Sequence, residues 1–160
     1  MRIDFRIDGA TELDRNLATL PDRVQMKVVR SAVRIAQKPA LDKAKRNAMS
    51  RVGGTMGGLI AENLILRASH KQPKDTYSML VRMRRQNEGA PDAFWPPKTK
   101  AGVQHYIPSA IEFGHGADKA SAARPFIRPA VDATIEETKR ILAKEMGAGI
   151  LREAIKGRYK

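Results

Sequence analysis

The chain has 160 residues, a length that suits one domain with a core of its own. Lysine and arginine number 30 against 17 aspartates and glutamates, so the formal net charge is +13. Such an excess favours polyanions as partners, namely nucleic acid, an anionic membrane surface or an acidic protein, and it does not choose among them. A basic protein without any anionic ligand is the remaining interpretation.

The residue composition narrows the class of protein further. Hydrophobic residues make up 42% of the chain and aromatic residues only 5%, so we expect an aliphatic core. The absence of cysteine excludes disulfides, thiol catalysis and thiolate metal sites, and it fits folding in a reducing cytoplasm. No apolar run approaches the roughly 18 residues of a membrane-spanning helix, and the first eight residues lack the continuous apolar core of a signal peptide.

The N-terminal segment alternates between apolar and charged residues. Ile3, Phe5 and Ile7 fall on one side, which predicts a half-buried strand over residues 1–8. Thr11 and Asp14 resemble a capping box, so a short helix is expected to begin there.

Residues 22–49 have the pattern of a long amphipathic helix. Pro39 lies inside it and predicts one bent helix or two consecutive helices, because proline removes a backbone hydrogen bond. Five basic residues, here called the basic stripe, fall on a narrow arc opposite the apolar face: Arg23, Lys27, Arg30, Arg34 and Lys38. The stripe is either a solvated face or a contact surface for DNA phosphates or an acidic partner.

The middle of the chain predicts a loop followed by a hairpin. Residues 52–58 are glycine-rich and indicate a mobile loop, which is not a nucleotide-binding P-loop because no Gly-Lys-Ser/Thr follows. A short helix over 59–63 comes next. Residues 64–68 and 76–84 then read as two antiparallel strands joined by a polar connector.

A long loop over residues 86–104 carries the only tryptophan of the chain. Loops of this length are usually functional or disordered. Phe94 and Trp95 are either an anchor folded onto their own domain or a docking group for a neighbouring subunit. The second interpretation is favoured here, because exposed tryptophan is enriched at the centres of interfaces.

The stretch from Tyr106 to Asp132 organises the C-terminal part. Residues 106–113 are apolar and predict a buried strand, which Gly114 ends. Phe126 and Ile127 are expected to enter the core just before Pro129 opens a helix over 129–146. Gly147 and Gly149 are expected to break that helix and to leave a last turn or two over 150–155.

These elements predict an α+β fold. A small, mainly antiparallel sheet would pack against a long kinked N-terminal helix and a C-terminal helix. We expect a single domain over residues 1–160, with the long loop at 86–104 and a loose basic tail at 156–160.

Signals of catalysis are missing from the sequence. The histidines are His70, His105 and His115, and no pair of them has a metal-ligand spacing. Glu112 and His115 could form an acid–base pair, but a turn histidine beside a structural glutamate is the simpler interpretation. Neither a nucleophile elbow nor a dinucleotide fingerprint occurs. The sequence therefore predicts a protein that is not an enzyme and binds no cofactor or metal.

One stretch resembles a known family. A predicted strand ends in an aromatic-rich Glu-Phe-Gly, and Arg-Pro-Phe and Arg-Pro-Ala follow after a loop; the residues are Tyr106, Ile111, Glu112, Phe113, Gly114, Arg124, Pro125, Phe126, Arg128, Pro129 and Ala130. This pattern resembles the tail-component or tail-completion (head–tail joining) proteins of long-tailed bacteriophages. The upstream strand, long helix and glycine loop occur in the usual order. His115, where threonine is common, and the loop around Phe94 depart from the family pattern.

The resemblance implies a non-enzymatic virion protein of the phage neck, made in the cytoplasm of the host bacterium. Such proteins are expected to form a ring, commonly a hexamer, between neighbouring neck and tail-tube proteins, through which DNA passes. The basic stripe would then face an acidic partner or contact genomic double-stranded DNA weakly. The alternative is a stand-alone nucleic-acid-binding protein that uses the stripe on phosphates.

Overall fold

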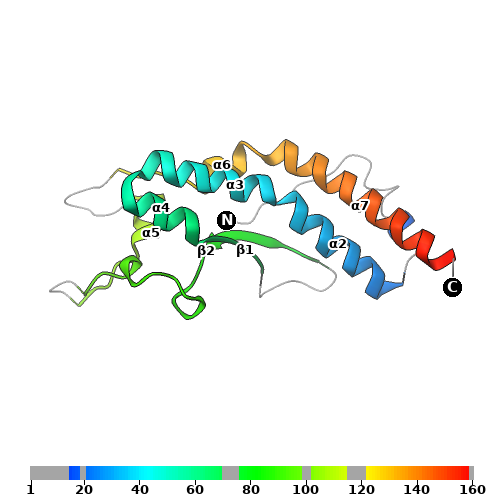
Figure 1. Cartoon of the computed structure of the whole chain (residues 1–160), viewed down its shortest axis with the longest axis horizontal. Helices are drawn as coiled ribbons and strands as arrows, with labels where there is room; N and C mark the ends of the chain where they lie inside the picture. Colours follow the sequence, from blue (N-terminus) through cyan, green and yellow to red (C-terminus); the bar gives the residue numbers. More distant parts are fainter. Residues whose placement is uncertain (1–14, 19–20, 70–75, 99–101, 115–121, 159–160) are drawn as a thin grey trace. The chain divides into compact units, whose positions relative to one another are not determined.

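The computed structural model describes residues 15–18, 21–69, 76–98, 102–114 and 122–158 (Figure 1). The predicted strand over 1–8, the capping residues Thr11 and Asp14, and both His70 and His115 lie outside these ranges. Residues 15–18 are helical. The fold is mostly helical α+β, as the sequence predicted, with a long bent N-terminal helix, a two-stranded antiparallel sheet and a long C-terminal helix that packs on the N-terminal one.

The described elements follow one another in this order: α2 (Asp22–Ala36), α3 (Lys38–Asn47), the π-helical turn η1 (Ala48–Val52), α4 (Gly54–Asn63), β1 (Leu64–Ala68), β2 (Met79–Met83), the 3₁₀ turns η2 (Gln86–Glu88) and η3 (Asp92–Phe94), α5 (Ile107–Phe113), α6 (Arg128–Asp132) and α7 (Ile135–Arg158). The described residues fall into two compact units. Unit 1 lies within Met1–Pro39, Leu66–Leu80 and Thr134–Lys160, and unit 2 within Ala40–Ile65 and Val81–Ala133. The single domain predicted over 1–160 stays a prediction.

The predicted bend in the long helix is confirmed. Helix α2 ends at Ala36, Gln37 forms a turn, and α3 begins at Lys38. Pro39 is the second residue of α3, where a helix does not need its N–H. The proline therefore sits at the start of the second of two consecutive helices.

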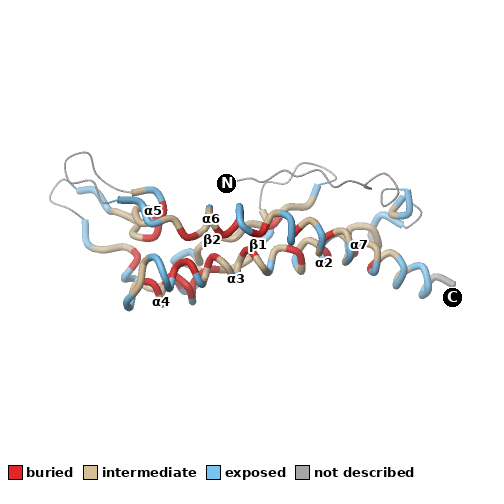
Figure 2. The backbone as a smooth tube through the Cα atoms, turned by 90° about the horizontal axis from the view of Figure 1, so that it is seen from above, coloured by how far each residue is buried: buried red, intermediate tan, exposed pale blue. Residues whose placement is uncertain are grey.

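Unit 1 is built on the packing of α2 against α7, which lie side by side (Figure 1). Its core is made of small and aliphatic side chains. Ala32, Ala36 and Leu142 are buried, and partly buried Val33, Ile141 and Met146 pack around them. Figure 2 shows how buried and exposed residues alternate along both helices, as expected for amphipathic helices.

Three predictions for the C-terminus were wrong. Helix α7 runs through Gly147 and Gly149 to Arg158, so the glycines do not break it and residues 156–158 are not a loose tail. Gly149 is buried, and a Cβ there would lie 2.7 Å from Cγ1 of Val28. The glycine therefore allows α2 and α7 to approach closely, and that packing offsets its cost in a helix of about 1 kcal/mol. The predicted helix over 129–146 is also divided, because Ala133 and Thr134 form a turn between α6 and α7.

Strands β1 and β2 pair with each other, which confirms the predicted hairpin. The amide of Ser69 donates to the carbonyl of Ser78 at 3.0 Å, and the amide of Arg84 donates to the carbonyl of Asn63 at 2.8 Å. Both pairs have the same register, as an antiparallel ladder requires. Strand β2 is shorter than the predicted range 76–84.

The predicted loop over 52–58 was wrong, because most of it is the first half of α4. Gly53 and Gly54 have positive φ angles of 71° and 54° and turn the chain from η1 into the helix. Gly57 lies against the preceding turn, where a Cβ would come within 2.8 Å of the carbonyl oxygen of Ala48. Gly53 and Gly54 thus allow a tight turn, and Gly57 allows α4 to lie close to η1. Local propensity cannot distinguish these uses of glycine from a loop.

The predicted strand over 106–113 is helix α5. Pro108 lies in its first turn, where proline suits a helix, and it would have cost a ladder hydrogen bond in a buried strand. The buried residues of α5 are Pro108 and Glu112, four positions apart on one helical face. Apolar runs this short do not separate helix from strand, and the proline was the overlooked signal.

Unit 2 has a core around two phenylalanines, which differs from the aliphatic core expected from composition. Phe94 and Phe126 are among the largest fully buried side chains, together with Ile60 and Leu64. The other buried members of this cluster are small: Ala44, Ala48, Ala61, Ala90 and Ala130. The prediction that Phe126 enters the core is confirmed, and Ile127 packs against the same cluster.

Candidate functional site

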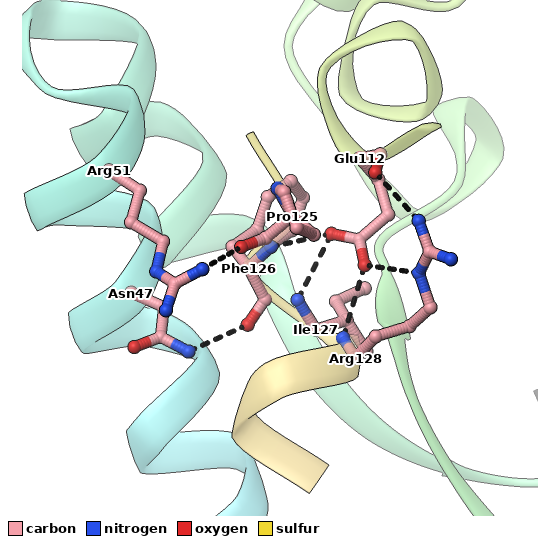
Figure 3. A network of polar contacts seen from close by, with 7 residues as sticks. All are labelled: Asn47, Arg51, Glu112, Pro125, Phe126, Ile127 and Arg128. Atoms are coloured by element: carbon pink, nitrogen blue, oxygen red, sulfur yellow. Dashed lines mark hydrogen bonds and ion pairs between the residues drawn. The ribbon is translucent and has the colours of Figure 1, made fainter. Parts of the chain in front are cut away.

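Four of the motif residues, Glu112, Pro125, Phe126 and Arg128, meet at one stretch of unit 2, residues 124–128, here called the loop 124–128 (Figure 3). Glu112, at the end of α5, is only 4% exposed and points at this loop. Its carboxylate accepts hydrogen bonds from the amides of Phe126 at 2.7 Å, Ile127 at 3.0 Å and Arg128 at 3.1 Å. These amides lie where the chain enters α6. A carboxylate is the strongest acceptor for such amides, so Glu112 fixes the start of that helix.

Arg128 completes this side of the loop. Its Nε lies 3.6 Å from Oε1 of Glu112, and its Nη2 donates to the backbone carbonyl of Glu112 at 3.2 Å. Its guanidinium also covers the ring of Phe113, with 4.9 Å between Cζ and the ring centroid. Phe113 is nevertheless 64% exposed. The neighbouring residues Glu112 and Phe113 thus have opposite roles, one inside the unit and one on its surface.

The other side of the loop is held by the end of α3 and by η1. Asn47 donates through Nδ2 to the carbonyl of Phe126 at 3.1 Å, and Arg51 donates through Nη1 to the carbonyl of Pro125 at 3.3 Å (Figure 3). Arg124 donates in the reverse direction, from Nη1 to the carbonyl of Val52 at 3.3 Å. Its own amide donates to the carbonyl of Ile111 at 2.8 Å. The loop is therefore fixed from both sides by side chains.

The remaining motif residues have conformational roles. Gly114 has φ 81° and ψ 163°, a region that is essentially open to glycine alone, and it ends α5. Pro129 lies in the first turn of α6, as predicted. Tyr106 precedes α5 and packs against Trp95, with 5.1 Å between ring centroids.

The polar atoms of this site are occupied by the fold itself. Among the described residues, no buried side-chain nitrogen or oxygen lacks a hydrogen-bond partner. The carboxylate of Glu112 is bound to three amides and to Arg128, so it is arranged as a scaffold and not as an acid or base aimed at solvent. Its suggested partner His115 lies outside the described residues. Within the described ranges, no three histidine, aspartate or glutamate side chains gather to hold a metal.

The basic stripe lies along α2 and the start of α3 in unit 1. Lys27, Arg30, Arg34 and Lys38 are exposed, and the side chain of Arg23 is not among the described ones. Lys27 pairs with Glu153 of α7 at 3.2 Å, and Arg30 lies over the ring of Tyr77 at 5.8 Å. Hydrogen bonds from Lys27 and Lys156 lower the pKa of Glu153. The described members of the stripe thus stay on the surface, and Lys27 among them is paired to an acid.

Phe94 and Trp95, the aromatic residues of the loop over 86–104, are more buried than groups that dock to a neighbouring subunit would be. Phe94 is 0% exposed and belongs to the core of unit 2, so the anchor interpretation holds for this residue. Trp95 is partly buried against the same core. Burial raises the pKa of Tyr106, the ring that packs edge-on against Phe94. Phe94 is therefore unavailable to a neighbouring subunit.

Sequence reasoning missed several residues that hold this region. The side chains of Arg82 and Glu88 form two hydrogen bonds of 2.7 Å each, and that contact raises the pKa of Arg82. Glu88 also accepts from the amide of Arg85 at 2.9 Å and so closes η2. Asn47 and Arg51 are spaced by one helical turn, but nothing in the sequence indicates that both face the loop 124–128. Their partners are carbonyl groups far along the chain, which carry no side-chain signal.

Comparisons of the chain with protein-family models, with curated proteins and with solved structures each found no match. In the described part of the chain, no helix is both long and apolar enough to cross a membrane.

Proposed function

We propose that this chain is a structural virion protein of the phage neck, which forms a ring that joins or completes the tail at the head–tail interface and lets DNA pass. The observation that supports this proposal is the arrangement of the motif residues. Glu112, the buried acid of the motif, is bound to three backbone amides, whereas Phe113, Arg124 and Arg128 are exposed. Such a site builds a rigid surface for contact with other proteins.

The charge of the chain fits this role. A ring at the neck has one face toward the head connector and one toward the tail tube, and heterologous contacts between copies close into such rings. Tight contacts with phosphates would hold the genome in the channel, because each neutralised phosphate adds affinity. The basic stripe therefore serves mainly in docking to acidic protein surfaces, with weak contact to double-stranded DNA.

Location in the virion tests this proposal directly. Electron cryomicroscopy of the virion neck is expected to place the chain in a symmetric ring at the head–tail junction. Purified full-length chain examined by negative-stain microscopy and native mass spectrometry gives the subunit number of any ring formed without partners. A neck map in which every protein is assigned and this chain is missing contradicts the proposal.

The exposed basic stripe favours a second function, stand-alone nucleic-acid binding. The double reversal Arg30→Glu with Arg34→Glu separates the two functions. If the variant assembles normally and loses duplex binding, the stripe belongs to DNA. If assembly fails while circular dichroism shows a folded chain, the stripe is an assembly interface. A salt dependence of duplex binding that flattens in the variant would show how many phosphates the stripe neutralises.

A further inference from the structure

Two arginines of unit 2 are fixed beside each other by a reciprocal pair of hydrogen bonds. Arg51 donates to the carbonyl of Pro125, the residue after Arg124, and Arg124 donates to the carbonyl of Val52, the residue after Arg51. Each arginine thus holds the backbone next to the other. The turn η1 and the loop 124–128 therefore place two positive charges in adjacent segments.

No acid among the described residues neutralises these charges. Among the described residues, neither guanidinium has a carboxylate within the 4.0 Å of an ion pair, and Glu112, the buried acid of this region, pairs with Arg128 instead. Both side chains are exposed. An arginine that makes a single hydrogen bond keeps most of its N–H donors for another partner. Like charges held side by side repel, and an anionic group bound between them would remove that cost.

An exposed apolar residue accompanies the arginines. Met49, in the same turn as Arg51, is 62% exposed. We call the set Arg51, Arg124 and Met49 the arginine surface. A duplex offers phosphates but keeps its bases stacked, so it would leave the methionine in water. A protein surface with carboxylates among small apolar groups satisfies both kinds of residue.

The chain itself carries one exposed pair of neighbouring carboxylates, followed by Lys139 and the exposed Arg140. Glu136 and Glu137, in the first turn of α7, are the one place in the described ranges where two exposed acids are neighbours in sequence. Exposed Asp132 and Ala133 precede them, and the other exposed acids stand singly at Asp22, Asp42, Glu62 and Asp92. Glu136 makes a 2.7 Å contact with Lys139, while Glu137 has no ion pair among the described residues.

We propose that the arginine surface of one copy binds the acidic first turn of α7, at Glu136 and Glu137, of a second copy. The two surfaces are different, so the contact is heterologous and can close into a ring. This inference rests on the proposed ring function and names the contact that would build it. Charge complementarity is its basis: the chain has only 17 acids against 30 basic residues, and Glu136 and Glu137 are the exposed adjacent pair.

A charge swap in the full-length chain tests the contact. Sedimentation velocity measures self-association of the wild type, of Arg124→Glu, of Glu137→Arg and of the variant carrying both changes. Each single reversal is expected to weaken self-association at least tenfold, and the double variant is expected to recover most of the loss, because the two charges have exchanged places. Matched controls are Arg46→Glu and Glu62→Arg, which reverse exposed residues outside both surfaces and are expected to leave self-association unchanged.

The outcomes separate this contact from the ring itself. If the wild type forms rings and Arg124→Glu assembles as well as Arg46→Glu does, the contact is wrong and the ring stands. Loss of assembly in both single variants without recovery in the double variant also overturns the pairing. A wild type that stays monomeric at every concentration and salt contradicts the pairing of two copies, while neck microscopy still decides the ring.

Glu137→Arg changes an exposed side chain, so it reports on the contact even if Arg124→Glu destabilises the loop. Unchanged assembly with weakened duplex binding in Arg124→Glu would assign the surface to nucleic acid.

Discussion

The two units of this chain are stabilised by different kinds of contact. Unit 1 is a helix pair, in which alanines, leucine and one glycine of α2 and α7 pack along a seam and the charged residues stay outside. Unit 2 is built around an irregular loop whose backbone is bound by a buried carboxylate, an amide and Arg51, while Arg124 of the loop donates to the carbonyl of Val52. The first kind of contact depends on close packing of small side chains, whereas the second needs each donor and acceptor in place.

This difference explains where function is expected. A loop held from both sides presents its surface residues in one geometry, as a docking surface requires. Phe113 and Arg128 gain that rigidity from Glu112, which lies next to one of them in sequence and bonds to the other. The packing of two helices spaces their exposed residues regularly, but it does not hold any irregular backbone in place. We therefore propose that unit 2 supplies one side of the specific contact, the other being the first turn of α7 in unit 1, and that the basic stripe of unit 1 has a general electrostatic role.

The largest effect is expected from Glu112→Ala in unit 2. The change leaves three amides and part of Arg128 without their acceptor, and breaking a buried charged contact of this kind costs about 3–5 kcal/mol. Urea unfolding followed by circular dichroism measures the loss. Glu62→Ala, which truncates an exposed glutamate on α4, is the control and is expected to stay within about 0.5 kcal/mol of the wild type. Equal stability of the two variants would contradict the scaffold role of Glu112.

The next effect comes from two glycines of α4 in unit 2. A Cβ at Gly57 would lie 2.8 Å from the backbone oxygen of Ala48, whereas a Cβ at Gly58 meets nothing within 4 Å. Gly57→Ala is therefore expected to destabilise the protein by about 1–3 kcal/mol, because a backbone carbonyl must shift. Gly58→Ala is expected to stabilise it by about 0.4–1 kcal/mol through the entropy of the unfolded chain. The sign of the difference between the two urea midpoints decides the prediction.

A matched pair in unit 1 is expected to show a smaller effect. Gly149→Ala brings a methyl group within 2.7 Å of Val28 Cγ1, while Gly147→Ala meets nothing within 4 Å. We expect a loss of about 1 kcal/mol at Gly149, less than at Gly57, because a side chain yields more easily than a backbone carbonyl. Val28→Ala removes the clash, so the double variant should be more stable than the sum of the two single changes predicts. Additive losses would show that the helix seam has no such close contact.

The same comparison shows what the sequence could predict. The helix seam of unit 1 follows from apolar periodicity, so the bent helix over 22–49 and its basic stripe were predicted, as was the hairpin. The errors concentrate where proline and glycine act through packing. Pro108 begins a helix in a segment that resembles a strand, Gly57 and Gly149 allow close approach inside helices, and Gly114 alone ends its element as expected. Helix propensity gives the free-energy cost of a glycine, but it does not show which neighbouring residue makes the contact that offsets this cost.

The site was predicted in part. The sequence pattern selected Glu112, Phe113, Arg124 and Arg128, and the structure brings these residues together around one loop. It could not assign their roles, because a buried acceptor and an exposed aromatic ring are adjacent letters in the sequence. Asn47 and Arg51 were missed because their partners are carbonyl groups 79 and 74 positions away. Contacts between a side chain and a distant backbone group leave no pattern that periodicity can detect.

The smallest effect is expected from the ion pair of unit 1. Lys27 and Lys156 lower the pKa of Glu153, so the folded protein holds its carboxylate ionised more readily than the unfolded chain does. That contribution to stability is present above the unfolded pKa of the carboxyl group and is lost as the pH falls through its folded pKa. Glu153→Gln should therefore be slightly less stable than the wild type at pH 7, and the difference should vanish in acid. Added salt should shrink it at pH 7 as well, because the pair lies on the surface. Urea midpoints of both proteins at neutral and acid pH, with and without salt, measure the difference. A difference in urea midpoint that stays constant in acid would mean that Glu153 acts through packing and not through its charge.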